Sequence, residues 1–277
     1  MAREEETAPP PHETLRIPSR VRKPGDGAPL QMAATLYRSD AAPPAAGWPL
    51  VVFNHGSTAA GRRPAGQMLR FETQARYFLA RGFAMLCPMR RGRGQSEGEY
   101  VEGYDPDPLK LGAGLRHGLD DLGAAIDFMR ARPDIDASRM LVAGHSRGGL
   151  LSVAFAGQRP AGIVGSINFS GGWIDIKGAA ETFTRDVLVR IAAGENGAGG
   201  LAAKGPVPSL WLYAENDGVF PPASVRRWHD AYTAAGGAAH LYIFGPLADA
   251  DGHMLHERPA LWQSAADAFL HQLGFRW

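Results

Sequence analysis

Two stretches of the chain place a serine between glycines with the spacing G-x-S-x-G, namely GHSRG at 144–148 and GQSEG at 94–98. A serine on a sharp strand-to-helix turn exposes its hydroxyl for attack on a carbonyl carbon. Small residues two positions away on either side let the strand and the helix approach each other. Because the chain holds 35 glycines in 277 residues, one accidental copy is unsurprising. The flanking elements must decide between Ser146 and Ser96.

Only Ser146 has the flanks that a nucleophile needs. The apolar run MLVAG at 140–144 predicts a strand that ends just before it, and GLLSVAFAGQ predicts a helix over 146–158. The ordinary alternative for Ser146 is a helix N-cap. Ser96 is separated from the strand ending at Pro88 by RRGRG and is followed by the polar EGEYVEGYDPDP. We therefore interpret Ser96 as a loop serine.

A serine hydroxyl is a weak nucleophile and needs a base. Among nine histidines, His253 lies in PLADADGHMLHERP, between the last predicted strand and the last predicted helix. In a parallel sheet this loop lies at the carboxyl edge, as the turn of Ser146 does. His145 adjoins Ser146, but neighbours on a tight turn project in different directions. His253 is the predicted base, and His256 remains the alternative.

The base in turn needs a carboxylate that orients it. The run SLWLYA ends at 214 and is followed by ENDGVFPP, which places Asp217 in the turn beyond a strand. Glu215 is the alternative, nearer the strand end. The chain order Ser146, Asp217, His253 is the order that accompanies this serine turn in hydrolases.

Acyl transfer also needs N–H donors aimed at the developing oxyanion. One donor is expected to be the backbone N–H of Arg147, directly after the nucleophile. The other is expected in FNHGST at 53–58, after the first central strand, where Ser57 or Thr58 could present its amide. The alternative is that this stretch forms only a turn.

Eight short apolar runs alternate with helical patterns from residue 14 onward, and this alternation predicts a mostly parallel sheet of about eight strands with helices on both faces. The runs lie at 14–18, 30–38, 49–54, 83–88, 140–144, 163–169, 209–214 and 240–244. Helices are expected near 68–79, 115–129, 146–158, 180–193, 222–236 and 258–272.

The chain is expected to form a single domain over 14–277. The Pro-rich, charged residues 1–13 predict a disordered arm. Residues 174–206 form the one long excursion between consecutive core strands, and they predict a small lid or cap. A single cysteine, Cys87, excludes an intrachain disulfide.

Lys plus Arg number 29 and Asp plus Glu number 28, so no overall basic field favours nucleic acid or an anionic membrane. No run is long enough to span a membrane, and the N-terminus carries no export signal. We expect a cytoplasmic protein that acts on a small molecule, or a periplasmic or secreted one if a signal peptide was removed.

The sequence as a whole resembles the α/β-hydrolase fold. The resemblance rests on HGS after the first central strand, GHSRGG at the serine turn, END after the penultimate strand and DGH before the last helix. Within that fold, residues 15–275 most resemble the dienelactone-hydrolase-like group and the catalytic domains of prolyl-oligopeptidase type. Dienelactone hydrolases proper use a cysteine at the turn, where this chain has Ser146. Cys87 lies in a strand that reads as buried core.

The segment PMRRGRGQSEGEY resembles the Arg-Gly-rich loop of these relatives. Its arginines, Arg93 among them, could bind a substrate carboxylate or pair with acidic loops nearby. Trp173, Phe220 and Tyr104 are candidate walls of a substrate pocket, and core packing is the alternative for each.

These observations predict a serine hydrolase that cleaves carboxylic esters and requires neither a metal nor an organic cofactor. Within the same fold the alternative is an aminopeptidase or amidase of prolyl-oligopeptidase type. A third alternative, of another class, is a non-catalytic binding protein that has kept the fold.

Overall fold

The computed structural model describes residues 8–57, 66–103, 105–174, 179–194 and 206–277. Within this part of the chain, eight strands form one sheet in the order β1-β2-β4-β3-β5-β6-β7-β8. β2 runs antiparallel to β1 and β4, and the other neighbouring pairs are parallel. The prediction of about eight mostly parallel strands is confirmed. The strands are β1 (His12–Arg22), β2 (Pro29–Tyr37), β3 (Trp48–Asn54), β4 (Ala84–Pro88), β5 (Ile135–His145), β6 (Ile163–Phe169), β7 (Ser209–Ala214) and β8 (Ala239–Phe244).

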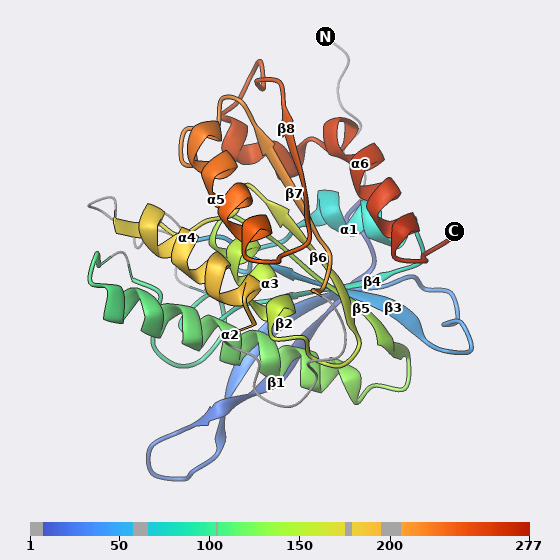
Figure 1. Ribbon diagram of the computed structural model, residues 1–277. Coiled ribbons are helices and arrows are strands. Elements are labelled where there is room, and N and C mark those ends of the chain that lie inside the picture. The colour runs from blue at the N-terminus through green and yellow to red at the C-terminus, as the bar shows by residue number, and fades with distance from the viewer. Residues whose placement is uncertain (1–7, 58–65, 104, 175–178, 195–205) are drawn as a thin grey trace.

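Helices cover both faces of the sheet. In Figure 1, α1 and α6 lie together on one side, and α2, α3 and α4 lie on the other side. The helices are α1 (Glu72–Leu79), α2 (Pro108–Arg130), α3 (Arg147–Gly157), α4 (Ala179–Ala192), α5 (Pro222–Ala234) and α6 (Pro259–Gln272), with the short 3-10 helix η1 (Gly252–Glu257) before α6.

Strand β5 shows why the central runs are continuously apolar. Leu141 and Ala143 pack into the core that includes side chains of α1 and α6, whereas Met140 and Val142 pack into the core that includes α2. Successive side chains of a strand point to opposite faces, so a strand covered on both faces must be apolar throughout. Because β3, β5, β7 and β8 run in the same direction, the loops that follow them lie at one edge of the sheet.

The structure differs from the predicted elements mainly at their ends. α2 begins at Pro108, because the side chain of Asp107 caps it by accepting a hydrogen bond from the N–H of Leu109 at 2.9 Å. α1 begins only at Glu72, because Phe71 has non-helical dihedral angles. The stretch that follows β8, expected to be a loop, contains η1, whose first turn is capped by Asp251.

Two expectations lie partly outside the described residues. Residues 1–7 of the predicted arm are not described, and β1 begins at His12. Of the predicted lid, the structure describes α4, and the lid stays a prediction. Within the described ranges, no helix has both the length and the apolar character to span a membrane.

Candidate active site

Ser146 lies on the turn that joins β5 to α3. Its dihedral angles are φ 57° and ψ −128°, which a residue with a Cβ adopts only under strain. A Cβ on Gly148 would lie 2.2 Å from the carbonyl oxygen of Asn54, and one on Gly144 would lie 2.4 Å from the carbonyl oxygen of Gly148. Both glycines of the motif are therefore needed for the close approach of β3, β5 and α3.

Ser96 and Cys87 both lie in surroundings that are typical of structural residues. Ser96 lies in a loop, where its hydroxyl donates to the carbonyl oxygen of Met89 at 2.6 Å and accepts from the N–H of Ala33 at 2.8 Å. Cys87 lies in β4 and is buried, and burial raises the pKa of its thiol. A thiol with a raised pKa holds little of the nucleophilic thiolate near neutral pH.

Asp217 and His253 come together across the loops that follow β7 and β8. The Nδ1 atom of His253 lies 3.2 Å from both carboxylate oxygens of Asp217. The Oδ1 atom of Asp217 also accepts hydrogen bonds at 2.9 Å from the N–H groups of Val219 and Phe220. The alternative acid, Glu215, is exposed to solvent. The carboxylate of Asp217 is thus fixed and directed at one ring nitrogen of His253.

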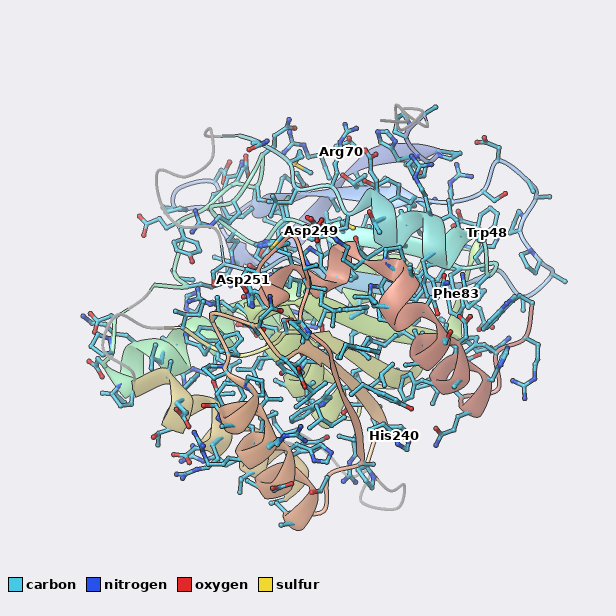
Figure 2. The ribbon with its side chains drawn as sticks, turned by 90° about the horizontal axis from the view of Figure 1, so that it is seen from above. Trp48, Arg70, Phe83, His240, Asp249 and Asp251 are labelled. Carbon is cyan, nitrogen blue, oxygen red and sulfur yellow. The ribbon has the colours of Figure 1, made fainter. Side chains whose placement is uncertain are left out.

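A cavity of about 980 Å³ lies beside this pair. Ser146, His253 and Ser57 all line it, together with the residues that lead into α1 and those of η1. Figure 2 labels Asp249 and Asp251 in the loop after β8, and His240 at the opposite end of that strand. The three candidate groups for acyl transfer therefore share one cavity at the carboxyl edge of the sheet.

His256, the alternative base, is placed differently. Its ring is 3% exposed and stacks on the ring of His145, with 3.8 Å between the ring centroids. Burial, together with the charge of His253, lowers the pKa of His256 to about 3. The carboxylate nearest to it is that of Glu257, at 3.8 Å from Nε2, and not Asp217. The geometry favours His253 over His256 as the base.

The loop after β3 passes close to Ser146. A Cβ on Gly56 would lie 3.0 Å from the Cβ of Ser146, and Ser57 follows directly and lines the same cavity. Arg147 is the first residue of α3, and the N–H groups of a first helical turn have no partner within the helix. The backbone of Ser57 and that of Arg147 therefore both lie beside Ser146, whereas Thr58, the alternative donor, lies outside the described residues.

Buried arginine contacts hold the loop after β3 in place. The ring of His55 donates from Nδ1 to the carbonyl oxygen of Gly56 at 2.7 Å and accepts at Nε2 from the N–H of Arg90 at 3.2 Å. The guanidinium of Arg90 donates to the carbonyl oxygen of His55 at 2.9 Å. Burial and the charge of Arg90 lower the pKa of His55 to about 3, so this ring is neutral near pH 7.

Glu102 joins this loop to the first residue of α3. It forms a bidentate ion pair with Arg90, and its Oε2 atom lies 3.6 Å from Nη1 of Arg147. All three side chains are at least 96% buried. Burial alone would raise the pKa of Glu102, but the charge and hydrogen bonds of Arg90, together with the charge of Arg147, lower it to about 2.

We expect Glu102→Gln to lower the free energy of unfolding by about 3 kcal/mol, because it leaves two buried guanidinium groups without their counter-charge. Urea unfolding at pH 7.5 measures this loss. The exposed pair Arg185 and Asp186 supplies the control, since Asp186→Asn is expected to change the stability by less than about 1 kcal/mol. Equal effects of the two substitutions would contradict the importance of the buried network.

The structure describes three of the four candidate substrate-binding residues. Trp173 and Phe220 line a second cavity of about 190 Å³, which shares Ile174 and Val219 with the larger one. Arg93 places its guanidinium carbon 3.3 Å from the ring centroid of Tyr100. Tyr104 lies outside the described residues. Binding of substrate by these side chains stays a prediction.

Two contributions to the site escaped the sequence analysis. Glu102 follows Arg90 by only twelve residues, but nothing in the local pattern indicates that the two are paired. His145 was set aside as a base, and its ring instead contacts the loop of His253, which is 108 residues away. The position of His145 directly before Ser146 was the one sequence feature that pointed to it, but only the folded chain shows what its ring contacts.

Comparisons with solved structures agree with this architecture. A protein of Klebsiella pneumoniae described as a dienelactone hydrolase is 18% identical, with a TM-score of 0.58, and the match covers 96% of this chain and 98% of that one. The esterase Pf2001 of Pyrococcus furiosus is 15% identical, with a TM-score of 0.62 and coverages of 95% and 92%. Dipeptidyl peptidase 4 of Porphyromonas gingivalis is 15% identical, with a TM-score of 0.65. The match covers 96% of this chain but only 35% of that peptidase.

These identities are low, so the structures show the fold alone, and they confirm the resemblance to the α/β-hydrolase fold. No curated protein sequence matches the chain. The family model described as "Serine aminopeptidase, S33" matches residues 50–196, slightly more than half of the chain. The matched region contains the loop after β3, the Ser146 turn and α4. The chain therefore belongs to this family of α/β-hydrolases.

Proposed function

We propose that this hydrolase cleaves carboxylic esters through an acyl-enzyme intermediate. Ser146 Oγ attacks the ester carbonyl carbon while His253 accepts the hydroxyl proton. The backbone N–H groups of Arg147 and Ser57 stabilise the tetrahedral oxyanion. His253 then gives the proton to the leaving alkoxide, and a water molecule hydrolyses the acyl-enzyme by the reverse sequence of proton transfers. Asp217 orients the imidazole and stabilises its charged form.

One observation supports this proposal above the others. A serine in a strained backbone conformation shares a cavity with a histidine whose Nδ1 atom is fixed 3.2 Å from a buried carboxylate. A buried aspartate that accepts from Nδ1 leaves Nε2 as the nitrogen that can take a proton from the serine.

The comparisons offer a second candidate within the same chemistry, an aminopeptidase or amidase. The description of the matched family and the peptidase neighbours favour it. However, the matches cover only 35% of the dipeptidyl peptidase and 40% of a puromycin-hydrolysing peptidase of Mycobacterium tuberculosis. The matches to the esterases of Pyrococcus furiosus and Thermogutta terrifontis cover 92% and 93% of those chains. We therefore place ester cleavage first.

A comparison of kcat/KM for p-nitrophenyl butyrate with that for aminoacyl-p-nitroanilides separates the two candidates. We expect turnover of the ester to exceed turnover of every anilide, in line with the nearly full coverage of the esterase chains, although the carboxylates of Glu72 and Glu257 also line the cavity. A series of esters with acyl chains of increasing length then defines the preferred acyl group. Faster anilide turnover would replace the esterase assignment with the peptidase one.

A further inference from the structure

The loop that carries His253 is fixed to the body of the protein through its backbone. We call residues 245–257, between β8 and α6, the histidine loop. The Oδ1 atom of Asp251 accepts the N–H of His253 at 2.8 Å and the N–H of Gly218 at 2.9 Å. Asn216 donates to the carbonyl oxygens of Leu247 and Ala250, each at 3.0 Å. These bonds tie the histidine loop to the loop of Asp217.

His145 links the histidine loop to the turn of Ser146. Its Nε2 atom lies 2.8 Å from the carbonyl oxygen of His253. A carbonyl oxygen only accepts, so Nε2 of His145 must carry the proton and donate it. His145 is the residue directly before Ser146, and the loop after β3 lies against its other side, since a Cβ on Gly56 would lie 3.3 Å from its Nδ1 atom. Three loops of the site therefore meet at this ring.

Packing fixes the orientation of the His145 ring. It stacks on the ring of His256 at 3.8 Å with an interplanar angle of 19°. The carbonyl oxygen of His256 is in turn held by Gln74 and by Trp262, whose Nε1 atom lies at 3.2 Å. A donor held this way at the end of β5 sets the position of the His253 backbone relative to Ser146, which the same strand carries.

We infer that His145 is a positioning residue for ester cleavage, which fixes the backbone of His253 at the distance from Ser146 that proton transfer requires. This inference rests on the proposed function, because it assigns His253 as the base. It follows from the Nε2 donor, its carbonyl acceptor and the adjacency of His145 to the nucleophile. The His145 ring itself neither attacks the substrate nor accepts the proton of the Ser146 hydroxyl.

Two substitutions separate the donor from the ring. His145→Phe keeps a ring against His256 but has no donor, and His145→Gln keeps an N–H donor without the ring. We expect His145→Phe to lower kcat for p-nitrophenyl butyrate by about 10- to 100-fold with KM unchanged, because a small misplacement of a catalytic group has effects of this size. We expect the kcat of His145→Gln to stay within about threefold of that of the parent. The glutamine N–H can still donate to the carbonyl oxygen of His253, but it holds this backbone less precisely than the histidine ring does.

The control is His240→Phe, which changes an exposed histidine at the far end of β8 and should leave kcat and KM as in the parent. Rates are normalised to the fraction of molecules that a fluorophosphonate titrates, so that misfolded protein does not count. If His145→Phe fails to fold, His145→Met and His145→Gln make the same comparison with unbranched side chains. Equal kcat for the donor and non-donor variants, or a loss confined to KM, would overturn the inference.

The tautomer of His145 gives a readout that needs no substrate. Long-range ¹H–¹⁵N spectra of the histidine rings should show His145 neutral with its proton on Nε2, and a proton on Nδ1 alone would overturn the inference. If the parent protein cleaves no ester but is still labelled by the fluorophosphonate, the proposed substrate class fails. The labelling rates of the His145 variants then still test the positioning role.

Discussion

A Ser146→Ala variant is expected to lose ester turnover by on the order of 10⁴- to 10⁶-fold in kcat, because removal of the nucleophile of a catalytic serine site ends acyl-enzyme formation. The residual rate above that in water should come from the backbone donors near Ser57 and Arg147, which the substitution leaves in place. Initial rates with p-nitrophenyl butyrate measure the loss, and labelling by a fluorophosphonate probe should disappear with it.

The matched control is Ser96→Ala, which removes the serine of the second G-x-S-x-G stretch. Because the hydroxyl of Ser96 bonds to backbone groups of Met89 and Ala33, this variant should lose some stability and keep its labelling and its kcat. Equal labelling of the parent and the Ser146→Ala protein would refute Ser146 as the nucleophile. A folded parent that is not labelled at all would favour a non-catalytic binding protein.

Stability should fall as the pH drops below about 6.5. His55 and His256 are 1% and 3% exposed, and burial lowers the pKa of each to about 3 from an ordinary value of 6.5. Between these two values the unfolded chain binds more protons than the folded one, so acid favours unfolding. The stabilisation is complete above about pH 6.5 and is lost as the pH falls toward 3. Each ring should lower the free energy of unfolding by about 2 kcal/mol between pH 7 and pH 5.

Urea unfolding at pH 7 and at pH 5 measures this difference. His256→Phe removes one of these buried rings and retains a ring against His145, so the difference between the two pH values should shrink by about 2 kcal/mol. The exposed His240→Phe should leave the difference as in the parent. A parent whose stability is the same at both pH values would contradict the neutral, buried state of these rings.

The fold was largely predictable from the sequence because its signal is local. Every central run that reads as continuously apolar is a strand buried on both faces, and the flanks of Ser146 distinguished it from Ser96. The predicted elements differ from the observed ones where a single side chain sets the start of a helix. Asp107 extends α2 toward its start, and Asp251 turns part of an expected loop into η1.

The sequence predicts that the candidate site residues lie at one edge of the sheet, but it does not predict the contacts that support them. Strand order and chain direction place the loops of Ser146, Asp217 and His253 at one edge, and this follows from the alternation of elements. By contrast, the pairing of Glu102 with Arg90 and the bond from His145 to His253 depend on the paths of irregular loops. Periodicity carries no information about such paths.

The strained backbone at Ser146 has a consequence for selection experiments. A positive φ angle is unfavourable for serine but not for glycine, so Ser146→Gly should relieve strain in the same step that removes the proposed nucleophile. Screens that reward thermal stability alone would therefore enrich inactive chains, and this residue embodies a trade-off between stability and activity. Any programme to stabilise this enzyme should hold position 146 fixed and select for turnover in parallel.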